Sequence, residues 1–325
     1  MKPKVYVTRR VPDAGLDLVL DACDAEVWEG DLPVPRDLLL EKVRAVEGLY
    51  CLLTERIDDE LLDAALELRV VSNYAVGFNN IDVDACTLRG IPVGNTPGVL
   101  TDTTADFAFA LLMAAARRIP EGAAFVEAGG WKTWGPKLML GADVHGATLG
   151  VIGFGRIGRA VARRANGFDM RVLCYDPFVK QIGSDVGELV SLETLLTESD
   201  FVSVHVPLTE ETHHLIGAAE LAGMKATAVL VNTARGPVVD PRALYDALTS
   251  GGIASAALDV TEPEPIPADH PLVGLPNCII TPHIASGSIA TRDEMAVIAA
   301  RNLIAGLAGE RLPHCVNTAV YGGEV

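Results

Sequence analysis

Short runs of apolar, often β-branched residues alternate with helical stretches along the whole chain. This alternation is typical of an α/β protein built on parallel sheets. The helical stretches of the first hundred residues are amphipathic, as residues 36–46 show. The strands predicted in this part are Lys4–Val7, Ala25–Trp28, Leu49–Leu53, Val70–Asn73 and Pro92–Asn95.

A second and more regular set of predicted strands begins near Thr148. Most of its members are apolar throughout, without polar residues at alternate positions, which suits a parallel sheet covered by helices on both faces. The six predicted strands are Thr148–Ile152, Arg171–Tyr175, Phe201–Val206, Val229–Asn232, Ala254–Asp259 and Cys278–Thr281.

Two further helices are predicted outside these sets. Residues 101–118 begin with threonine and aspartate, which cap helices, and continue with alanine and leucine, which propagate them. Residues 288–308 form a last helix without a strand partner in the second set, so we expect it to return to the first domain. The pattern predicts a domain of residues 1–100 plus 288–325 and another of residues 101–287. We expect each to be a doubly wound parallel sheet, with a cleft between them.

Composition and charge exclude several kinds of partner. The chain has 325 residues, of which 43 are acidic and 26 basic, for a formal net charge of -17. Affinity for nucleic acid comes mostly from lysine and arginine on phosphates, and anionic membranes attract the same residues. We therefore expect neither nucleic acid nor a membrane as a partner.

The cysteines and the N-terminus indicate the compartment. The six cysteines are scattered without a Cys-x-x-Cys pair, and Cys51 and Cys174 lie inside apolar runs. We expect core thiols in a reducing compartment, with neither disulfides nor structural zinc. The first ten residues lack the apolar core of a secretory signal. The longest apolar helix candidate, residues 107–116, is half of the roughly 20 residues that span a bilayer. A cytoplasmic protein is predicted.

Gly153, Gly155 and Gly158 lie between a predicted strand and a predicted helix with the spacing G-x-G-x-x-G. The first glycine permits a tight turn, the second lets the backbone approach a pyrophosphate, and the third lets the helix pack closely on the strand. The helix N-terminus presents N–H groups to the anion. Because both flanking elements are predicted, the motif indicates a dinucleotide site.

Asp176 ends the next predicted strand, 18 residues after Gly158. A carboxylate there accepts hydrogen bonds from the adenosine ribose and repels a 2′-phosphate, so NAD(H) is favoured. Arg171 and Lys180 lie nearby in the sequence and keep NADP(H) possible. The alternative is an aspartate that only opens a turn.

Arg235, Glu264 and His283 follow the glycine motif, near the ends of later predicted strands. Arginine can bind a planar carboxylate through two parallel hydrogen bonds, and a histidine beside a carboxylate can transfer a proton. Taken singly, the three residues could be a salt-bridged turn, a solvated loop charge and a loop histidine. Together, at the carboxyl ends of strands where open α/β sheets bind ligands, they predict a hydride-transfer site.

These motifs make the chain resemble the D-2-hydroxyacid dehydrogenase family, and most of all its glyoxylate/hydroxypyruvate reductase branch. The resemblance implies two Rossmann-like or flavodoxin-like domains and covers nearly the whole chain. The chain departs from the family pattern at Ala285, where the family commonly has glycine, and at Asn79, where the family often has aspartate. The segments that carry it are residues 72–82, 95–106, 149–162, 206–209, 232–236, 258–265 and 281–286.

The resemblance implies catalytic roles for three residues. Arg235 would bind the substrate carboxylate and polarise its carbonyl, His283 would be the general acid, and Glu264 would orient it. The backbone N–H groups of Val76 and Gly77 would hold the other side of the carboxylate, with Leu53 as a further substrate residue. The cofactor set it implies consists of Thr104, Gly153, Gly155, Arg156, Ile157, Gly158, Asp176, Val206, Pro207, Thr212, Thr233, Ala234, Asp259, Ala285 and Ser286.

The predicted reaction is NADH-dependent reduction of a small 2-keto acid, glyoxylate or hydroxypyruvate. Other substrates of the family, such as D-3-phosphoglycerate, D-lactate or phosphite, are alternatives. An NAD-sensing protein of the corepressor type is the alternative outside enzymes. The resemblance also implies a homodimer formed through the dinucleotide-binding domain, with Trp134 reaching the substrate pocket of the partner. His213 and His214 are interpreted as surface or cofactor-loop residues, because no ligand spacing in the sequence supports a metal site.

Overall fold

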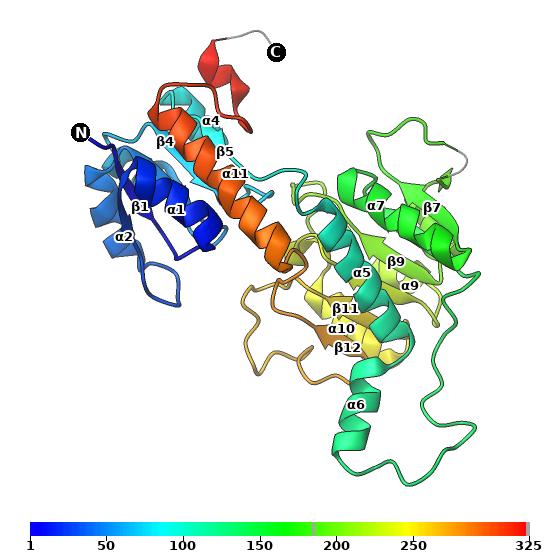
Figure 1. The fold of residues 1–325 in the computed structure, drawn as a ribbon. Helices are drawn as coiled ribbons and strands as arrows, with labels where there is room; N and C mark the ends of the chain where they lie inside the picture. Colours follow the sequence, from blue (N-terminus) through cyan, green and yellow to red (C-terminus); the bar gives the residue numbers. More distant parts are fainter. Residues whose placement is uncertain (184–185, 323–325) are drawn as a thin grey trace. The chain divides into compact units, whose positions relative to one another are not determined.

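The computed structural model describes residues 1–183 and 186–322. Its contacts divide the chain into two compact units (Figure 1). Unit 1 comprises Met1–Leu100 and Gly287–Val325, and unit 2 comprises Thr101–Ser286. Each unit holds one sheet whose strands pair in parallel, so the prediction of two parallel-sheet α/β domains is confirmed.

The sheet of unit 1 has five strands in the order β2-β1-β3-β4-β5, the flavodoxin-like order. Its strands are β1 (Lys4–Val7), β2 (Asp24–Val27), β3 (Gly48–Cys51), β4 (Val70–Asn73) and β5 (Val93–Gly94). Its helices are α1 (Asp13–Ala22), α2 (Arg36–Lys42), η1 (Val43–Ala45), α3 (Asp59–Ala64), α4 (Val83–Leu88), α11 (Ile289–Leu307) and η4 (Thr318–Tyr321). Both β3 and β4 are buried throughout, as their apolar runs predict.

Helix α11 packs on α1 and on strands β3 and β4, so the last predicted helix does return to the first domain (Figure 1). Its first turn is capped by the Ser288 hydroxyl, which accepts a hydrogen bond from Thr291 N at 3.3 Å. The two helices touch closely because Gly15 has no side chain: a Cβ there would lie 2.2 Å from the backbone carbon of Ala296. The contact covers one face of the sheet, and α2, α3 and α4 contribute buried residues to the core on the other.

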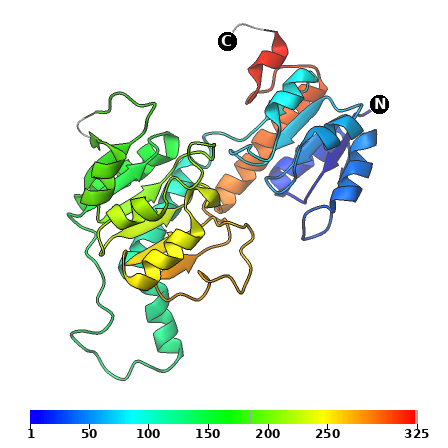
Figure 2. The same cartoon turned by 180° about the vertical axis from the view of Figure 1, so that it is seen from behind.

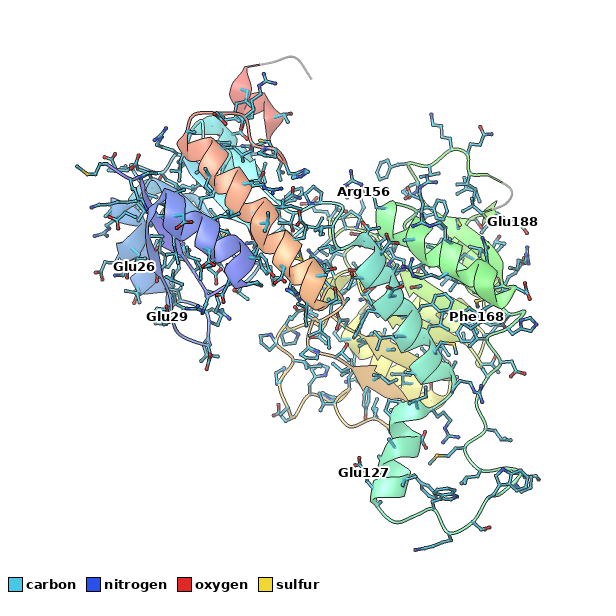
Figure 3. All side chains as sticks on the ribbon, viewed as in Figure 1. Glu26, Glu29, Glu127, Arg156, Phe168 and Glu188 are labelled. Atoms are coloured by element: carbon cyan, nitrogen blue, oxygen red, sulfur yellow. The ribbon has the colours of Figure 1, made fainter. Side chains whose placement is uncertain are left out.

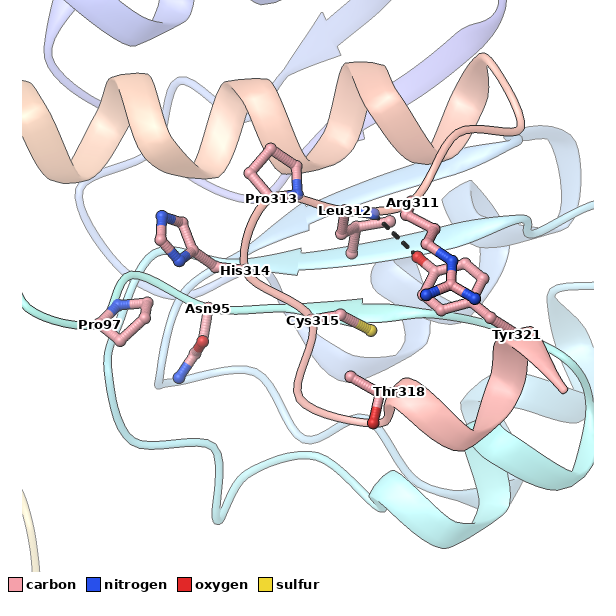
Figure 4. A pocket seen from close by; sticks show the side chains of 9 residues that line it. All are labelled: Asn95, Pro97, Arg311, Leu312, Pro313, His314, Cys315, Thr318 and Tyr321. Atoms are coloured by element: carbon pink, nitrogen blue, oxygen red, sulfur yellow. Dashed lines mark hydrogen bonds between the residues drawn. The ribbon is translucent and has the colours of Figure 1, made fainter. Parts of the chain in front are cut away.

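The segment after α11 runs along the edge strand β5 and closes a small cavity of about 340 Å³ (Figure 4). Gly94 forms a bridge with Cys315, and Asn95 N donates to the carbonyl of His314 at 3.2 Å. The Tyr321 hydroxyl accepts a hydrogen bond from Leu312 N at 2.9 Å. The contacts of Gly94 and Asn95 pair the edge strand of unit 1 with the tail of the chain, and the bond of Tyr321 lies within the tail.

The sheet of unit 2 has seven strands in the order β12-β11-β10-β9-β6-β7-β8. From β6 the chain continues to β7 and β8 on one side, then returns to β9 on the other side. The direction of strand order therefore reverses between β6 and β9, where doubly wound sheets bind ligands at the carboxyl ends of the strands. The strands are β6 (Thr148–Ile152), β7 (Arg171–Tyr175), β8 (Glu188–Leu189), β9 (Phe201–Val204), β10 (Val229–Asn232), β11 (Ser255–Leu258) and β12 (Cys278–Ile280).

Helices cover both faces of this sheet (Figures 1 and 2). Apolar residues of α5 and α7 form one core with the strands, and residues of α8, α9 and α10 form the other. The helices of unit 2 are α5 (Thr101–Ala116), α6 (Ile119–Glu127), α7 (Arg156–Ala165), η2 (Asn166–Phe168), α8 (Leu192–Glu198), α9 (Ala218–Gly223), η3 (Gly236–Val238) and α10 (Pro241–Ser250).

Two predictions about unit 2 are wrong. The sheet has seven strands rather than six, because the two exposed residues of β8 pair with β7 at the edge without an apolar run to mark them. The helix predicted over residues 101–118 ends at Ala116, and a second helix, α6, follows. The break is at Arg118, whose φ is 53°, just before Pro120 in the first turn of α6. Proline is favoured in a first turn because its missing N–H has no partner there.

The structure matches part of what the sequence predicts for the cysteines and the helix lengths. All six cysteines are unpaired; four are buried, whereas Cys278 and Cys315 are partly exposed. Burial raises the pKa of the Cys86, Cys174 and Cys278 thiols to about 12, which makes them unreactive. Among the described residues, no helix has the length and apolar character needed to cross a bilayer.

Candidate active site

The glycine motif connects β6 to α7 at the point where the strand order of unit 2 reverses. Gly153 has φ 90°, and a Cβ there would lie 2.7 Å from the backbone of His205 and Val206. A Cβ on Gly158 would lie 2.0 Å from the carbonyl oxygen of Gly153, so only glycine lets α7 pack on β6.

Gly155 differs from the other two glycines, because a Cβ there would meet no heavy atom within 4 Å in the described chain. The open space lies before the first turn of α7, which begins at Arg156, followed by Ile157 (Figure 3). The N–H groups of such a turn and the helix dipole attract an anion. These residues fit the pyrophosphate of a dinucleotide.

Asp176 follows β7 and is tied to the glycine turn. Its Oδ2 accepts a hydrogen bond from Phe154 N at 2.8 Å, and its Oδ1 accepts one from Phe178 N at 2.9 Å. A carboxylate can accept about four hydrogen bonds, so each oxygen retains capacity for a ribose hydroxyl. Arg171 lies at the other end of β7, where Glu188 and Glu198 bind it at 3.0 and 2.6 Å. Arg171 therefore lies away from the site of a 2′-phosphate.

Arg235, Glu264 and His283 come together because they follow adjacent strands. Arg235 lies after β10, Glu264 after β11 and His283 after β12, and these three strands are neighbours in the sheet. His283 Nδ1 lies 2.6 Å from Glu264 Oε1, a short hydrogen bond between an imidazole and a carboxylate. The carboxylate accepts from Nδ1–H, which leaves Nε2 as the nitrogen that can exchange a proton with a substrate.

Gly236 brings the loop of Arg235 against the loop of Glu264. A Cβ on Gly236 would lie 1.8 Å from the carbonyl oxygen of Thr261 and 2.1 Å from its carbonyl carbon. The turn before it is held by Asn232, whose amide donates to Arg235 O at 2.9 Å and accepts from Ala234 N at 3.0 Å. The position of the guanidinium thus depends on an asparagine and a glycine.

The electrostatics of the three side chains are coupled. Burial lowers the pKa of the Arg235 guanidinium, and the charge of Glu264 acts in the opposite direction. Burial raises the pKa of Glu264, but the hydrogen bond and charge of His283, the N–H of Thr261 and the charge of Arg235 together outweigh it. The net effect lowers the pKa of Glu264, so its carboxylate is ionised at neutral pH.

Asp259 holds the loop that carries His283. Its carboxylate is buried and accepts hydrogen bonds from the Thr281 hydroxyl at 2.6 Å, Ile284 N at 2.9 Å and Ala285 N at 2.7 Å. The carbonyl of Asp259 also accepts from His283 N at 2.9 Å. His283 has φ 54°, an unfavourable region for histidine that these bonds help to maintain. Asp259 is therefore placed to position His283, in addition to the cofactor role implied by the resemblance.

The other residues predicted for the cofactor lie in unit 2 with the glycine turn. Val206, Pro207 and Thr212 form the loop after β9, where the Thr212 hydroxyl donates to Pro207 O at 2.6 Å. Thr233 follows β10, and its hydroxyl is buried without a hydrogen-bond partner in the described part of the chain. Thr233 precedes Arg235 by two residues, and a buried hydroxyl without a partner can bond a polar group of a bound molecule. Three further positions complete the set: Thr104 and Ala285 are buried and Ser286 is partly exposed.

The residues predicted for the substrate in unit 1 lie after β3 and β4, which are neighbouring strands. Asn95 donates to Val76 O at 2.8 Å and Asn73 donates to Gly77 O at 2.9 Å. The bond to Val76 O fixes the peptide plane that carries the N–H of Gly77. The plane that carries the N–H of Val76 is fixed by Thr96 N, which donates to Ala75 O at 2.9 Å. Leu53 is 39% exposed in the loop after β3.

The sequence interpretation missed the residues that hold the site together, namely Asn73, Asn95, Asn232, Gly236 and Thr281. Asparagine, glycine and threonine near strand ends are the available signal, but such residues are common in loops. The five residues differ from ordinary turn residues only in their contacts with segments that are distant in the sequence.

As a whole, the site offers a nucleotide cradle, an arginine and a histidine backed by a carboxylate at one edge of a parallel sheet. This combination can bind a carboxylate beside a carbonyl and supply a proton to its oxygen. The fold and the site together support a dehydrogenase acting on small acids.

Comparison with known proteins agrees with this chemistry. Residues 109–285 match the sequence profile described as "D-isomer specific 2-hydroxyacid dehydrogenase, NAD binding domain". A glyoxylate reductase of Korarchaeum cryptofilum is 55% identical over 98% of this chain and 97% of its own.

Two solved structures show the same fold. A Thermus thermophilus protein superposes with a TM-score of 0.91 at 47% identity, over 96% of this chain and 99% of its own. The NADPH-dependent glyoxylate/hydroxypyruvate reductase of Sinorhizobium meliloti, solved with NADP and malonate, has a TM-score of 0.85 at 30% identity, over 97% of both chains. The chain is an oxidoreductase that belongs to the D-isomer-specific 2-hydroxyacid dehydrogenase family.

Proposed function

We propose that the protein reduces glyoxylate, and hydroxypyruvate as a second substrate, with NADH as the preferred cofactor. The observation that carries the proposal is the 2.6 Å hydrogen bond between His283 Nδ1 and Glu264 Oε1. The two residues follow β12 and β11, and β11 is the neighbour of β10, which Arg235 follows. The names of the relatives supply the substrate class: they include a glyoxylate reductase and a glyoxylate/hydroxypyruvate reductase.

In this proposal Arg235 binds the substrate carboxylate and draws electron density from the neighbouring carbonyl oxygen. A partly buried guanidinium is suited to this, because water competes less for its N–H groups. The N–H groups of Val76 and Gly77 hold the same carboxylate, and Leu53 contacts the substrate. A bound nicotinamide cofactor supplies the hydride.

His283 supplies the proton in reduction. Its Nε2–H donates to the carbonyl oxygen as negative charge develops there, and the product is a hydroxyl group. The imidazole left behind keeps its proton on Nδ1, where the Glu264 carboxylate accepts it. In the reverse direction the neutral Nε2 accepts the hydroxyl proton. Glu264 thus favours the tautomer that the reaction needs in both directions.

The preference for NADH rests on Asp176. Its carboxylate is fixed by Phe154 N and Phe178 N beside the glycine turn, where it would accept the ribose hydroxyls and repel a 2′-phosphate. Ion pairs with two glutamates hold Arg171 at the opposite end of β7, which further weakens the case for NADPH. NADPH is the alternative cofactor.

We further propose a homodimer formed through unit 2. Helix α6 has no buried residue, and the segment after it extends from the body of the unit in both views (Figures 1 and 2). Trp131 and Trp134 on this segment are 60% and 78% exposed, as an interface element without its partner would be. Trp134 would then contribute to the substrate pocket of the partner. The six unpaired cysteines support a reducing, cytoplasmic compartment.

The test is oxidation of NADH and of NADPH with glyoxylate, hydroxypyruvate, pyruvate and a bulkier 2-keto acid. The proposal predicts that NADH with glyoxylate and hydroxypyruvate gives the highest kcat/KM. A strong preference for NADPH would contradict the role of Asp176 but not the reaction. Cofactor binding without turnover of any of these acids would contradict the proposed reaction.

A further inference from the structure

Two histidines that the proposed reaction does not use lie against a carboxylate from a distant segment. His213 and His214 are adjacent in the loop after β9, and Glu262 comes 48 residues after His214, in the loop after β11. His214 Nε2 lies 2.8 Å from Glu262 Oε2, and His213 Nε2 lies 3.8 Å from Glu262 Oε1. One ligand atom from each of the three residues lies within 4.8 Å of the other two.

The backbone holds both imidazoles toward the carboxylate. His214 has φ 51°, and its N donates to Pro237 O at 2.7 Å, while His213 N donates to Thr209 O at 3.0 Å. The two rings stack with centroids 4.0 Å apart and planes 28° from parallel. Two adjacent histidines on extended backbone would point to opposite sides. The left-handed conformation at His214 instead places both rings on one side.

Two imidazoles and a carboxylate are ligands that zinc and similar divalent ions prefer. Bonds of about 2.0–2.1 Å to a tetrahedral ion place the ligand atoms about 3.3 Å apart. The 2.8 Å and 3.8 Å contacts involve different oxygens of Glu262, and the ligand atoms of the three residues lie within 4.8 Å of one another. Binding of one ion therefore requires movements of up to about 1.5 Å between ligand atoms, which side-chain rotation can supply. The three residues leave one position for water.

Two neighbouring features favour such a site. Asp240 Oδ2 lies 4.0 Å from His214 Nδ1, the ring nitrogen that faces away from Glu262. This distance is too long for a hydrogen bond, so Asp240 contributes negative charge near the site rather than a bond to the ring. The His213 side chain is 51% exposed, which gives an ion a path from solvent, and the net charge of -17 favours the approach of cations.

We propose that His213, His214 and Glu262 bind a divalent transition-metal ion of the zinc class. The sequence interpretation of these histidines as plain surface or cofactor-loop residues rested on the lack of a nearby carboxylate, and the fold supplies one from another loop.

The bound ion would join two loops of the candidate active site. One loop contains Thr212, whose hydroxyl bonds Pro207 O, and the other contains Glu264, two residues after Glu262. Zinc would therefore slow amide hydrogen exchange in residues 207–216 and 260–265 together. The site itself does not depend on which acid the enzyme reduces.

The test is zinc binding by the untagged full chain, measured by equilibrium dialysis with metal analysis. The wild type is expected to bind one Zn²⁺ per chain. His213→Ala and Glu262→Gln are each expected to weaken binding at least about tenfold, since even residues that only orient metal ligands cost 10–100-fold when removed. His213 is mostly exposed, so its substitution tests the site without endangering the fold.

Two controls separate this site from others. His145→Ala removes an exposed histidine of unit 2 that lies 3.5 Å from Asp169, and it is expected to leave binding unchanged. His283→Ala removes the imidazole of the candidate active site and is also expected to retain one Zn²⁺ per chain. Loss of zinc in His283→Ala, but not in His213→Ala, would place the ion in the active site and overturn the proposal.

Absence of zinc binding by the wild type at concentrations up to the millimolar range would likewise overturn it and leave His214 and Glu262 as an ion pair. Equal zinc affinity of the wild type and Glu262→Gln would also overturn the proposal. Metal content is measured without turnover, so failure here is distinct from failure of the proposed reaction.

Discussion

The contact between the loops of Arg235 and Glu264 depends on the absence of a side chain at Gly236. In Gly236→Ala the new Cβ would lie 1.8 Å from Thr261 O and 2.1 Å from Thr261 C, both backbone atoms that no rotamer change can move aside. Ordinary contact needs more than 3 Å, so the two loops must separate by more than an ångström. We expect overpacking to lower stability by about 1–3 kcal/mol.

The effect on catalysis follows from the same displacement. Moving a binding or catalytic group by about 1 Å costs roughly a hundredfold in rate, equivalent to about 2.7 kcal/mol of transition-state stabilisation. We therefore predict that Gly236→Ala lowers kcat/KM for glyoxylate at least about a hundredfold. Thermal unfolding and steady-state kinetics measure the two effects separately.

Gly167→Ala is the matched control, because a Cβ at Gly167 would meet no described atom within 4 Å. That variant should differ from wild type by no more than about 0.5 kcal/mol in stability and should keep its kcat/KM. If Gly236→Ala retained the kcat/KM of wild type, the reasoning that links this glycine to the geometry of Arg235 and Glu264 would be refuted.

Four further predictions concern single residues. Asp259→Asn replaces one of the two carboxylate oxygens that accept hydrogen bonds from Thr281, Ile284 and Ala285. It should lower kcat about 10–100-fold with little change in KM. An unchanged kcat would show that Asp259 does not position His283. Asp176→Asn should raise the ratio of NADPH to NADH kcat/KM about tenfold, and an unaltered ratio would contradict the assignment of this carboxylate to the ribose. Burial lowers the pKa of His205 to about 3. The unfolded chain then binds one more proton than the folded chain between pH 3 and pH 6.5, so this residue makes stability fall as pH falls through that range. His205→Gln should flatten the dependence of the urea midpoint on pH between 7 and 5, and an identical slope would show that His205 does not contribute. Trp134→Ala in protein that light scattering shows to be dimeric should raise the KM for glyoxylate, whereas an unchanged KM would exclude a role in the pocket of the partner.

The sequence predicted the sheets well because their strands carry strong signals. Strands β1, β4, β6, β7 and β10 have the predicted bounds, since each is a compact run bounded by turn residues or the start of a helix. Strand β8 was missed because two exposed edge residues carry no hydrophobic pattern. Helix α6 was missed because its residues face solvent, so nothing in the pattern distinguishes it from the end of α5.

Only those residues of the candidate site whose side chains perform the chemistry could be predicted from the sequence. Arg235, Glu264 and His283 stand out by their side chains and their place after strands, and the geometry brings them together. The contacts of Asp259 with the His283 loop, and of Gly236 with Thr261, join segments that are 22 or more residues apart. Neither can be inferred from local pattern, because they depend on which loops the strand order makes adjacent.

The most direct test of the account is the kinetics of His283→Ala with glyoxylate and NADH. The account predicts that turnover falls by roughly a hundred- to ten-thousandfold, the usual cost of a lost general acid, while NADH affinity measured by fluorescence is retained. Near-normal turnover in a correctly folded variant would contradict it, because the proton would then have to come from a group other than His283.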